Sequence, residues 1–176
     1  MQLVIALGNP GEKYKQTRHN AGFLALDYIL KDLKVISCTS KFDAKICEVH
    51  DPEKTFYIYP ETYMNASGQA VKKIMDFYKL QPKDVLVLQD EIDLPLGTIK
   101  FTQGSGHAGH NGVRSIIDEL GTNEFRRIRI GIESRERGGH IPTEAFVLQN
   151  FKEDELPKIP FDAIKARVLL ELKPKI

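Results

Sequence analysis

The sequence predicts an α/β fold in which a twisted mixed β-sheet carries helices on both faces. Strand-like and helix-like stretches alternate along the chain, as they do in α/β domains. Residues 85–88 form an uninterrupted apolar run, which is typical of a central strand covered on both sides. Residues 127–133 alternate instead, so the isoleucines of this segment are expected in the core, and Arg127 and Arg129 are expected to face outward.

Hydrophobic periodicity and turn residues set the boundaries of the expected elements. Strands are predicted at residues 2–7, 43–50, 55–59, 85–89, 97–103 and 127–133. Helices are predicted at residues 21–33, 66–80, 112–120, 143–149 and 162–172. No linker-like segment divides the chain, and its length suits one full core, so residues 1–176 are expected to form a single domain.

Composition narrows the classes of function. The formal net charge of +1 gives no global attraction to nucleic acid or membrane, so any basic site must be local. The N-terminus opens directly into a strand, without a signal peptide or a long apolar stretch, and we expect a soluble cytoplasmic protein. The two cysteines, Cys38 and Cys47, form neither a disulfide framework nor a zinc pattern, and inert packing in a reducing compartment is expected for both.

The candidate chemistry centres on His19 and Asp90. Residues 7–11 form a turn signal after the first strand, and a helical pattern begins directly after Asn20, which stands at the N-cap position. Asp90 follows the apolar run 85–88 and is expected at the C-terminal end of that strand. A carboxylate there can accept an imidazole N–H, which fixes the tautomer of a general base. The alternative is that Asp90 caps a turn and His19 is a solvated loop residue, and the residues alone leave both open.

A glycine-rich stretch at residues 104–112 leads into a predicted helix. Its glycines allow a ligand close to the backbone, and Asn111 is expected to be the N-cap of that helix. No Gly-Lys-Ser/Thr follows, which weakens a phosphate-binding interpretation. His107 and His110 raise the alternative of a metal site with nearby acidic residues, although their spacing is not that of a zinc-binding helix.

Three asparagines, Asn9, Asn65 and Asn111, stand at predicted strand-to-helix junctions. Each offers one acceptor and two donors, which match the amide groups of a peptide, although a helix-capping role would explain Asn65 alone. The chain has no Gly-x-Ser-x-Gly motif, and neither cysteine has a nucleophile signature. The residues therefore favour activation of water by a general base over covalent catalysis.

Basic residues gather in two places. Arg127 and Arg129 are expected on one strand face, where they could hold phosphate oxygens. Lys13, Lys15 and Arg18 lie beside the first loop. The alternative interpretation of both groups is a solvated surface.

Five segments together resemble the bacterial peptidyl-tRNA hydrolase family. They occur in family order over residues 3 to about 132 and read LGNPGEKYKQTRHNAGF, YMNASG, QDEIDLPLG, KFTQGSGHAGHNG and FRRIRIGI. The resemblance implies hydrolysis of the ester between a peptide and the 3′ end of tRNA. It also implies a cytoplasmic monomer that needs no cofactor, metal, membrane or obligatory protein partner.

The resemblance assigns catalysis to three residues. His19 is the general base, Asp90 orients it, and Asn9 positions the reacting carbonyl or water. The residues expected to bind the peptide and the terminal nucleotide, or to line the cleft around them, are Tyr14, Met64, Asn65, His110 and Asn111.

The resemblance also places tRNA phosphate contacts on one strand pair. Arg129 matches a phosphate-binding arginine of the family, which often pairs it with a lysine. Thr102 stands at the lysine position in this chain, and Lys100, two residues earlier, is expected on the same strand face as the second contact. The C-terminal region, which forms a helix over the cleft in the family, is short here.

Two other classes of function remain as alternatives. One is a metal-dependent hydrolase that uses His107, His110 and the acidic residues near Asp90. The other is a non-catalytic RNA-binding module that uses the arginine-rich strand and the glycine-rich stretch. Activity that survives chelation excludes the first, and ester cleavage excludes the second.

Overall fold

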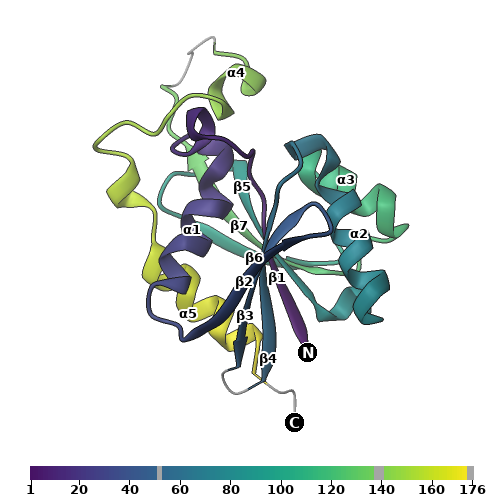
Figure 1. Cartoon of the computed structure of the whole chain (residues 1–176). Coiled ribbons are helices and arrows are strands. Elements are labelled where there is room, and N and C mark those ends of the chain that lie inside the picture. The colour runs from purple at the N-terminus through teal and green to yellow at the C-terminus, as the bar shows by residue number, and fades with distance from the viewer. Residues whose placement is uncertain (51–52, 137–140, 174–176) are drawn as a thin grey trace.

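A seven-stranded mixed sheet separates two layers of helices (Figure 1). The computed structural model describes residues 1–50, 53–136 and 141–173. The strand order is β2-β3-β4-β1-β5-β7-β6. The strands are β1 (Gln2–Ala6), β2 (Val35–Lys41), β3 (Ala44–His50), β4 (Lys54–Pro60), β5 (Val85–Pro95), β6 (Ile99–Gln103) and β7 (Arg126–Glu133).

Parallel pairing in the middle of the sheet brings several strand ends to one edge. β1 pairs in parallel with both β4 and β5, and β5 pairs in parallel with β7. The outer pairs β2–β3, β3–β4 and β6–β7 are antiparallel, which makes the sheet mixed, as predicted. Open α/β sheets bind ligands beyond the carboxyl ends of their parallel strands. A binding or catalytic site is therefore expected beyond the ends of β1, β5 and β7.

Helices cover both faces of the sheet, as the sequence predicts. Helices α1 (Ala21–Leu30) and α5 (Phe161–Glu171) lie on one face, and α2 (Ser67–Tyr78) and α3 (Asn111–Leu120) lie on the other (Figure 1). The short helix α4 (Thr143–Val147) contacts the turn that precedes α1. Within the described residues, the structure contains no helix that is both long and apolar enough to cross a membrane.

Alternate strand residues divide between two hydrophobic cores. Val4 and Leu86 point into the core under α1 and α5, whereas Leu3 and Val87 point into the core under α2 and α3. The alternation predicted for β7 is also present, because its isoleucines are fully buried in the first of these cores. Burial of this apolar surface from water is the main favourable contribution to folding.

Strand β2 is the element that the sequence did not predict. It is an edge strand, and every residue after Val35 is exposed. Because neither face of the strand is buried, its sequence VISCTSK lacks the apolar alternation by which a strand is predicted. Strand β5 was predicted but is longer than expected, because it runs to Pro95 and does not end at residue 89. Its later residues lose the continuous apolar character that marks the first part of the strand.

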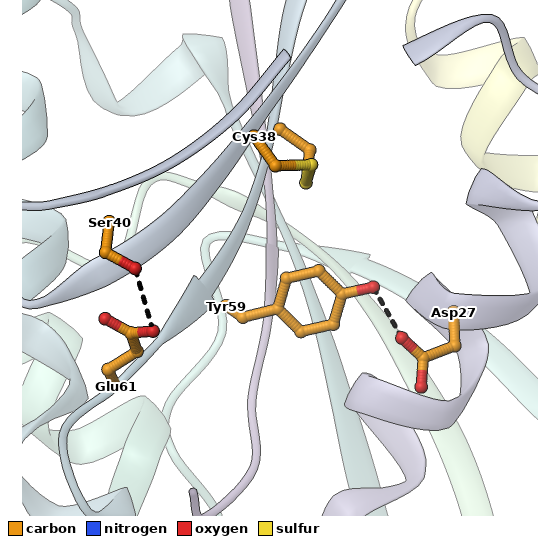
Figure 2. The surroundings of a disulfide bond; sticks show 6 residues. Asp27, Cys38, Ser40, Tyr59 and Glu61 are labelled. Atoms are coloured by element: carbon orange, nitrogen blue, oxygen red, sulfur yellow. Dashed lines mark hydrogen bonds between the residues drawn. A yellow bond between two sulfur atoms is a disulfide. The ribbon is translucent and has the colours of Figure 1, made fainter.

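The expectation that Cys38 and Cys47 pack as free thiols is wrong. They form a disulfide between β2 and β3 (Figure 2), at positions directly opposite in the hairpin register, with a Cα–Cα distance of 4.1 Å. The pairing depends on the register of β2, which the sequence did not reveal. Next to the disulfide, Tyr59 of β4 donates a hydrogen bond of 2.7 Å to Asp27 of α1 (Figure 2).

Candidate active site

A contact between His19 and Asp90 forms the centre of the candidate active site. His19 lies in the 3-10 turn Arg18–Asn20, directly before α1. Its Nδ1 is 2.9 and 3.0 Å from the two carboxylate oxygens of Asp90. The side chains are 11% and 3% exposed, so the contact is largely shielded from water. The two residues meet, as hypothesised from the sequence, and neither is the solvated or turn-capping residue of the alternative.

The position of Asp90 within β5 differs from the prediction. Asp90 was expected at the end of its strand, but β5 continues to Pro95. The last residue of β5 that pairs with β1 is Leu88, which lies opposite Ala6. Asp90 therefore lies just beyond the end of β1. At this position, β5 is no longer paired with β1.

Two local features hold the His19 turn against the sheet. The backbone N–H of Asn9 donates to Asn20 Oδ1 at 2.9 Å, and Asn20 Nδ2 donates to the Asn9 carbonyl at 3.0 Å. Asn20 stands at the N-cap position, as predicted, but its side chain makes this link instead of capping α1. A Cβ at Gly22 would come within 2.6 Å of the carbonyl oxygens of Leu7 and Leu88, so only glycine lets α1 approach both strand ends.

His110 is the second partner of Asp90, and its two ring nitrogens have different roles. Asn111 was predicted to cap α3, but it is the first helical residue and His110 is the N-cap. His110 Nδ1 accepts the backbone N–H groups of Gly112 and Val113 at 3.2 and 3.3 Å, and Nε2 lies 2.8 Å from Asp90 Oδ1. A neutral imidazole has one acceptor nitrogen. That nitrogen is Nδ1, so Nε2–H donates to Asp90.

Electrostatics in this network favour an ionised carboxylate beside a basic imidazole. Burial alone raises the pKa of Asp90, but the electrostatic interactions and hydrogen bonds with the rings of His19 and His110 outweigh burial and hold that pKa well below its usual range. Burial lowers the pKa of His19, but the charge and hydrogen bond of Asp90 outweigh it, so the pKa of His19 is raised above its ordinary value. His19 is thus a stronger base than a free histidine.

The same three residues, His19, Asp90 and His110, also form a candidate metal site. One potential ligand atom from each of His19, Asp90 and His110 lies within 4.8 Å of the others. A metal on Nε2 of His110 would require the ring proton on Nδ1, where it would face two backbone N–H groups. The donor set therefore favours a hydrogen-bonded network. His107, from the metal alternative, accepts the N–H of Gly109 and lies outside this cluster.

A cleft of about 570 Å³ opens at the network. Four of the predicted site residues line it, namely His19, Asp90, His110 and Asn111. Glu91 and Asp93, which are acidic residues near Asp90 that the metal alternative included, also line it. Sequence reasoning did not identify its other charged or polar residues, which are Arg114, Thr143 and Glu144. Thr143 and Glu144 belong to α4, and nothing in the local sequence indicates that this short helix packs beside the turn that carries His19.

Asn9 and Met64 are joined by a hydrogen bond, and neither is among the residues that line the cleft. Asn9 is 7% exposed, and its Oδ1 accepts the backbone N–H of Met64 at 2.8 Å. This bond fixes the orientation of the amide and directs Oδ1 to the protein, which leaves Nδ2 as the donor for another group. Met64 is 5% exposed and packs against Gly112 at the start of α3.

Asn65 and Tyr14 are more exposed than the residues of the network. Asn65 lies inside the 3-10 turn Met64–Ala66, so the capping role considered for it is wrong, and Ala66 is the N-cap of α2. Tyr14 is half-buried and meets the exposed ring of Tyr63 edge to face, with 6.3 Å between ring centroids. Neither Asn65 nor Tyr14 is among the residues that line the cleft.

Arg129 and Lys100 lie directly opposite each other on β7 and β6. They therefore share one face of the strand pair, as expected. Arg129 Nε donates to Glu91 at 2.7 Å, and Glu91 lines the cleft, so this basic pair adjoins the proposed catalytic network. Thr102 shares the same face, opposite Arg127.

The expectation that Arg127 faces outward is wrong. Its side chain is 1% exposed and donates to the carbonyls of Ser105 and Gly106 at 2.7 and 2.8 Å, and to Gln89 Oε1 at 3.1 Å. The guanidinium thus anchors the glycine-rich stretch and is not available to a phosphate. Arg18, which was grouped with surface lysines, is also buried.

Comparisons with known proteins agree on one family. The sequence model described as peptidyl-tRNA hydrolase matches residues 3–172. The peptidyl-tRNA hydrolase of Oceanobacillus iheyensis is 41% identical over 172 residues, covering 97% of this chain and 91% of that protein. The peptidyl-tRNA hydrolase of Lactiplantibacillus plantarum is 39% identical over 170 residues, covering 96% and 89%.

Solved structures lead to the same family. A peptidyl-tRNA hydrolase in complex with N-propanol has a TM-score of 0.87 and 32% identity, covering 98% of this chain and 88% of that one. The peptidyl-tRNA hydrolase from Acinetobacter baumannii has a TM-score of 0.83 and 29% identity, covering 98% and 92%. The fold and cleft define an α/β protein with a His–Asp–His network at the carboxyl edge of its sheet. The chain belongs to the peptidyl-tRNA hydrolase family.

Proposed function

We propose that this chain hydrolyses the ester that joins a peptide to the 3′ end of tRNA and releases both products. The observation that carries the proposal is the orientation of His19 in the cleft. Its Nδ1 is held by Asp90, and its Nε2 has no hydrogen-bond partner in the part of the chain that the structure describes. Membership of the family supports the choice of substrate.

In the proposed reaction, His19 Nε2 takes a proton from water while the water oxygen attacks the ester carbonyl. The tetrahedral intermediate then expels the ribose oxygen, and the imidazolium returns its proton to that oxygen. Asp90 stabilises the imidazolium through Nδ1–H and keeps the ring in the tautomer that the reaction needs. A well-placed general base of this kind contributes about 10²- to 10⁴-fold in rate.

Asn9 is the proposed donor to the reacting carbonyl or water. Because the backbone N–H of Met64 occupies Oδ1 of Asn9, the amide presents Nδ2 as a donor of fixed orientation. A donor that is already oriented toward a developing oxyanion contributes about 10²- to 10³-fold in rate.

The remaining site residues are proposed to bind substrate. Hydrogen bonds to the peptide main chain would make the enzyme tolerant of peptide sequence while requiring an acylated amine, because a free ammonium fits poorly where a neutral amide is expected. His110 borders the cleft, and since both ring nitrogens are engaged, it would meet the substrate through its ring face. The proposed binding residues are Tyr14, Met64, Asn65, His110 and Asn111.

The proposed tRNA contact beyond the ester is a phosphate held by Arg129 and Lys100. These side chains sit opposite each other beside the cleft, and the guanidinium keeps two terminal nitrogens beyond its bond to Glu91. Thr102 is uncharged and does not replace the lysine of the family. We further propose that the enzyme acts as a monomer in the cytoplasm, on nucleic acid and without a membrane, cofactor or obligatory protein partner.

The test is incubation of an N-acetylated aminoacyl-tRNA with the protein, with and without a chelator. We expect cleavage at equal rates in both samples. Loss of cleavage on chelation would support a metal-dependent hydrolase, and binding of the tRNA without cleavage would support a non-catalytic RNA-binding module.

A further inference from the structure

A buried ion pair lies directly behind the proposed base. Arg18, the residue before His19, donates from Nη2 to Glu155 Oε2 at 2.6 Å. The two side chains are 2% and 5% exposed. Burial raises the pKa of Glu155, but the Ser134 hydroxyl, the Lys152 backbone N–H and the charge of Arg18 outweigh it and lower that pKa, so the carboxylate stays ionised at neutral pH.

The guanidinium of Arg18 also binds the chain segment that follows α4. Nη1 donates to the carbonyl of Asn150 at 3.0 Å, and the backbone N–H of Arg18 donates to the carbonyl of Gln149 at 3.0 Å. The guanidinium lies over the ring of Phe146, 4.2 Å from its centroid. A single side chain therefore joins the His19 turn to α4, to the segment after α4 and, through Glu155, to the region that leads into α5.

These contacts connect two walls of the cleft. His19 is the neighbour of Arg18 in sequence, and Phe146 belongs to α4, whose residues Thr143 and Glu144 line the cleft. Backbone bonds reinforce the junction, because Phe151 N–H donates to the carbonyl of Gln16. A shift of Arg18 relative to Phe146 would change the distance between the base and the α4 wall.

We propose that Arg18 and Glu155 are positioning residues for the hydrolysis, which hold α4 at a fixed distance from His19. The inference rests on the proposed function, because it takes His19 as the base. Burying two charges carries a desolvation penalty, so a well-packed apolar pair of similar size could stabilise the fold as well. An apolar pair of this kind makes no directional hydrogen bonds, so it would not fix the distance between α4 and His19. Reaction rates are sensitive to displacements of the reacting groups by about 1 Å.

The test separates folding from positioning with Arg18→Met, Glu155→Gln and the apolar double variant Arg18→Met/Glu155→Leu. For each, the melting temperature, kcat and KM on N-acetylaminoacyl-tRNA, and the pH profile are measured. We expect each single variant to lower both the melting temperature and kcat/KM, with at least a tenfold loss in kcat/KM. We expect the double variant to recover the melting temperature but not kcat/KM, and the acidic limb of all pH profiles to stay in place because the His19–Asp90 contact is intact.

Two controls make the outcome decisive. Lys158→Met removes an exposed ion pair with Asp154 in the same segment and should leave kcat/KM unchanged. Arg18→Lys keeps the charge while losing the forked donor geometry, and should retain the fold with a several-fold loss in kcat/KM. Full activity in Arg18→Lys and in the double variant would overturn the positioning role. If the wild type itself failed to cleave N-acetylaminoacyl-tRNA, the proposed function would fail, which is a different result.

Discussion

His110 donates from Nε2 to Asp90 Oδ1 at 2.8 Å while its Nδ1 caps helix α3. The N-terminus of a helix and the carboxylate behind the proposed base are therefore joined by one imidazole. Asp90 has two imidazole partners, and only His19 has a ring nitrogen left for the substrate. This asymmetry distinguishes the base from the residue that supports it, although both are histidines.

The pH dependence of the reaction should report the pairing of His19 with Asp90. The base must be neutral, and the pKa of His19 is raised, so kcat/KM should increase with pH and reach half its maximum above the ordinary histidine value of about 6.5. Asp90→Asn removes the charge that raises this pKa, so the acidic limb should move to lower pH. The same variant should lose on the order of 10³- to 10⁴-fold in kcat, because the amide no longer enforces the tautomer. An acidic limb that stays in place or moves to higher pH in Asp90→Asn would contradict the pairing.

Substitutions of His110 should separate its two hydrogen bonds. Asn is a good N-cap, so His110→Asn should keep α3 capped and the melting temperature near that of the wild type, while it loses the donor to Asp90. A hydrogen bond to a charged group is worth about 1.5–3 kcal/mol, which predicts roughly a 10- to 100-fold loss in kcat/KM. His110→Ala loses both bonds and should also lose about 1 kcal/mol of stability. Thermal unfolding and steady-state kinetics check both effects, and wild-type kinetics in His110→Asn would show that the Asp90 contact is dispensable.

Removal of Arg129 should weaken binding of tRNA more than chemistry. In Arg129→Ala, we expect KM for N-acetylaminoacyl-tRNA to rise about tenfold and the dependence of log affinity on log salt to lose about one unit of slope. A short N-acetylaminoacyl-adenosine should be cleaved as before. The measurement is a salt series of KM for both substrates.

Two controls belong with the Arg129 experiment. Arg129→Ala frees the Glu91 carboxylate beside the cleft, and Arg129→Ala/Glu91→Gln removes that charge as well. Lys72→Ala, which breaks an exposed pair on α2, should change neither KM nor slope. Equal losses on both substrates in the Arg129 variants would reject a phosphate contact.

The Cys38–Cys47 disulfide should affect stability and not activity. β2 is an edge strand, separated from β5 by β3, β4 and β1. Closing a loop of this size is worth about 2–3 kcal/mol in the chain-entropy description, or roughly 5–10 °C in melting temperature for a chain of this length. Dithiothreitol should lower the melting temperature of the oxidised protein by that amount without changing kcat/KM. Cys38→Ser should melt at the lower temperature with or without dithiothreitol, and an unchanged melting temperature on reduction of the wild type would refute the stabilisation.

The features that local sequence determines were predictable. Apolar runs and alternation identify the buried faces of β5 and β7. The helix predicted at residues 112–120 ends at Leu120 as expected, before Gly121 in a left-handed conformation. His19 and Asp90 were paired by hypothesis because both follow predicted strands of one sheet. Parallel strands place such residues at a common edge whatever the details of the turns.

The features that depend on register and tertiary packing were not predictable. Arg127 alternates with buried isoleucines, so its position on β7 is correct, but the glycine-rich stretch covers it and supplies carbonyl partners. The local sequence around Arg18 indicates a basic, exposed loop. Its burial depends on Glu155, which is 137 residues away in the sequence. The N-cap of α3 was predicted to be Asn111 because asparagine has the higher capping propensity. His110 is the N-cap instead, and in that position its Nε2 also donates to Asp90.

The most direct test of the account is single-turnover cleavage of N-acetylaminoacyl-tRNA by His19→Ala, measured beside the Kd for the same tRNA. We expect the cleavage rate to fall by at least about 10²-fold, the lower bound for loss of a general base, while the Kd stays within a few-fold of the wild type. Cleavage near the wild-type rate in this variant would contradict the assignment of His19 as the base.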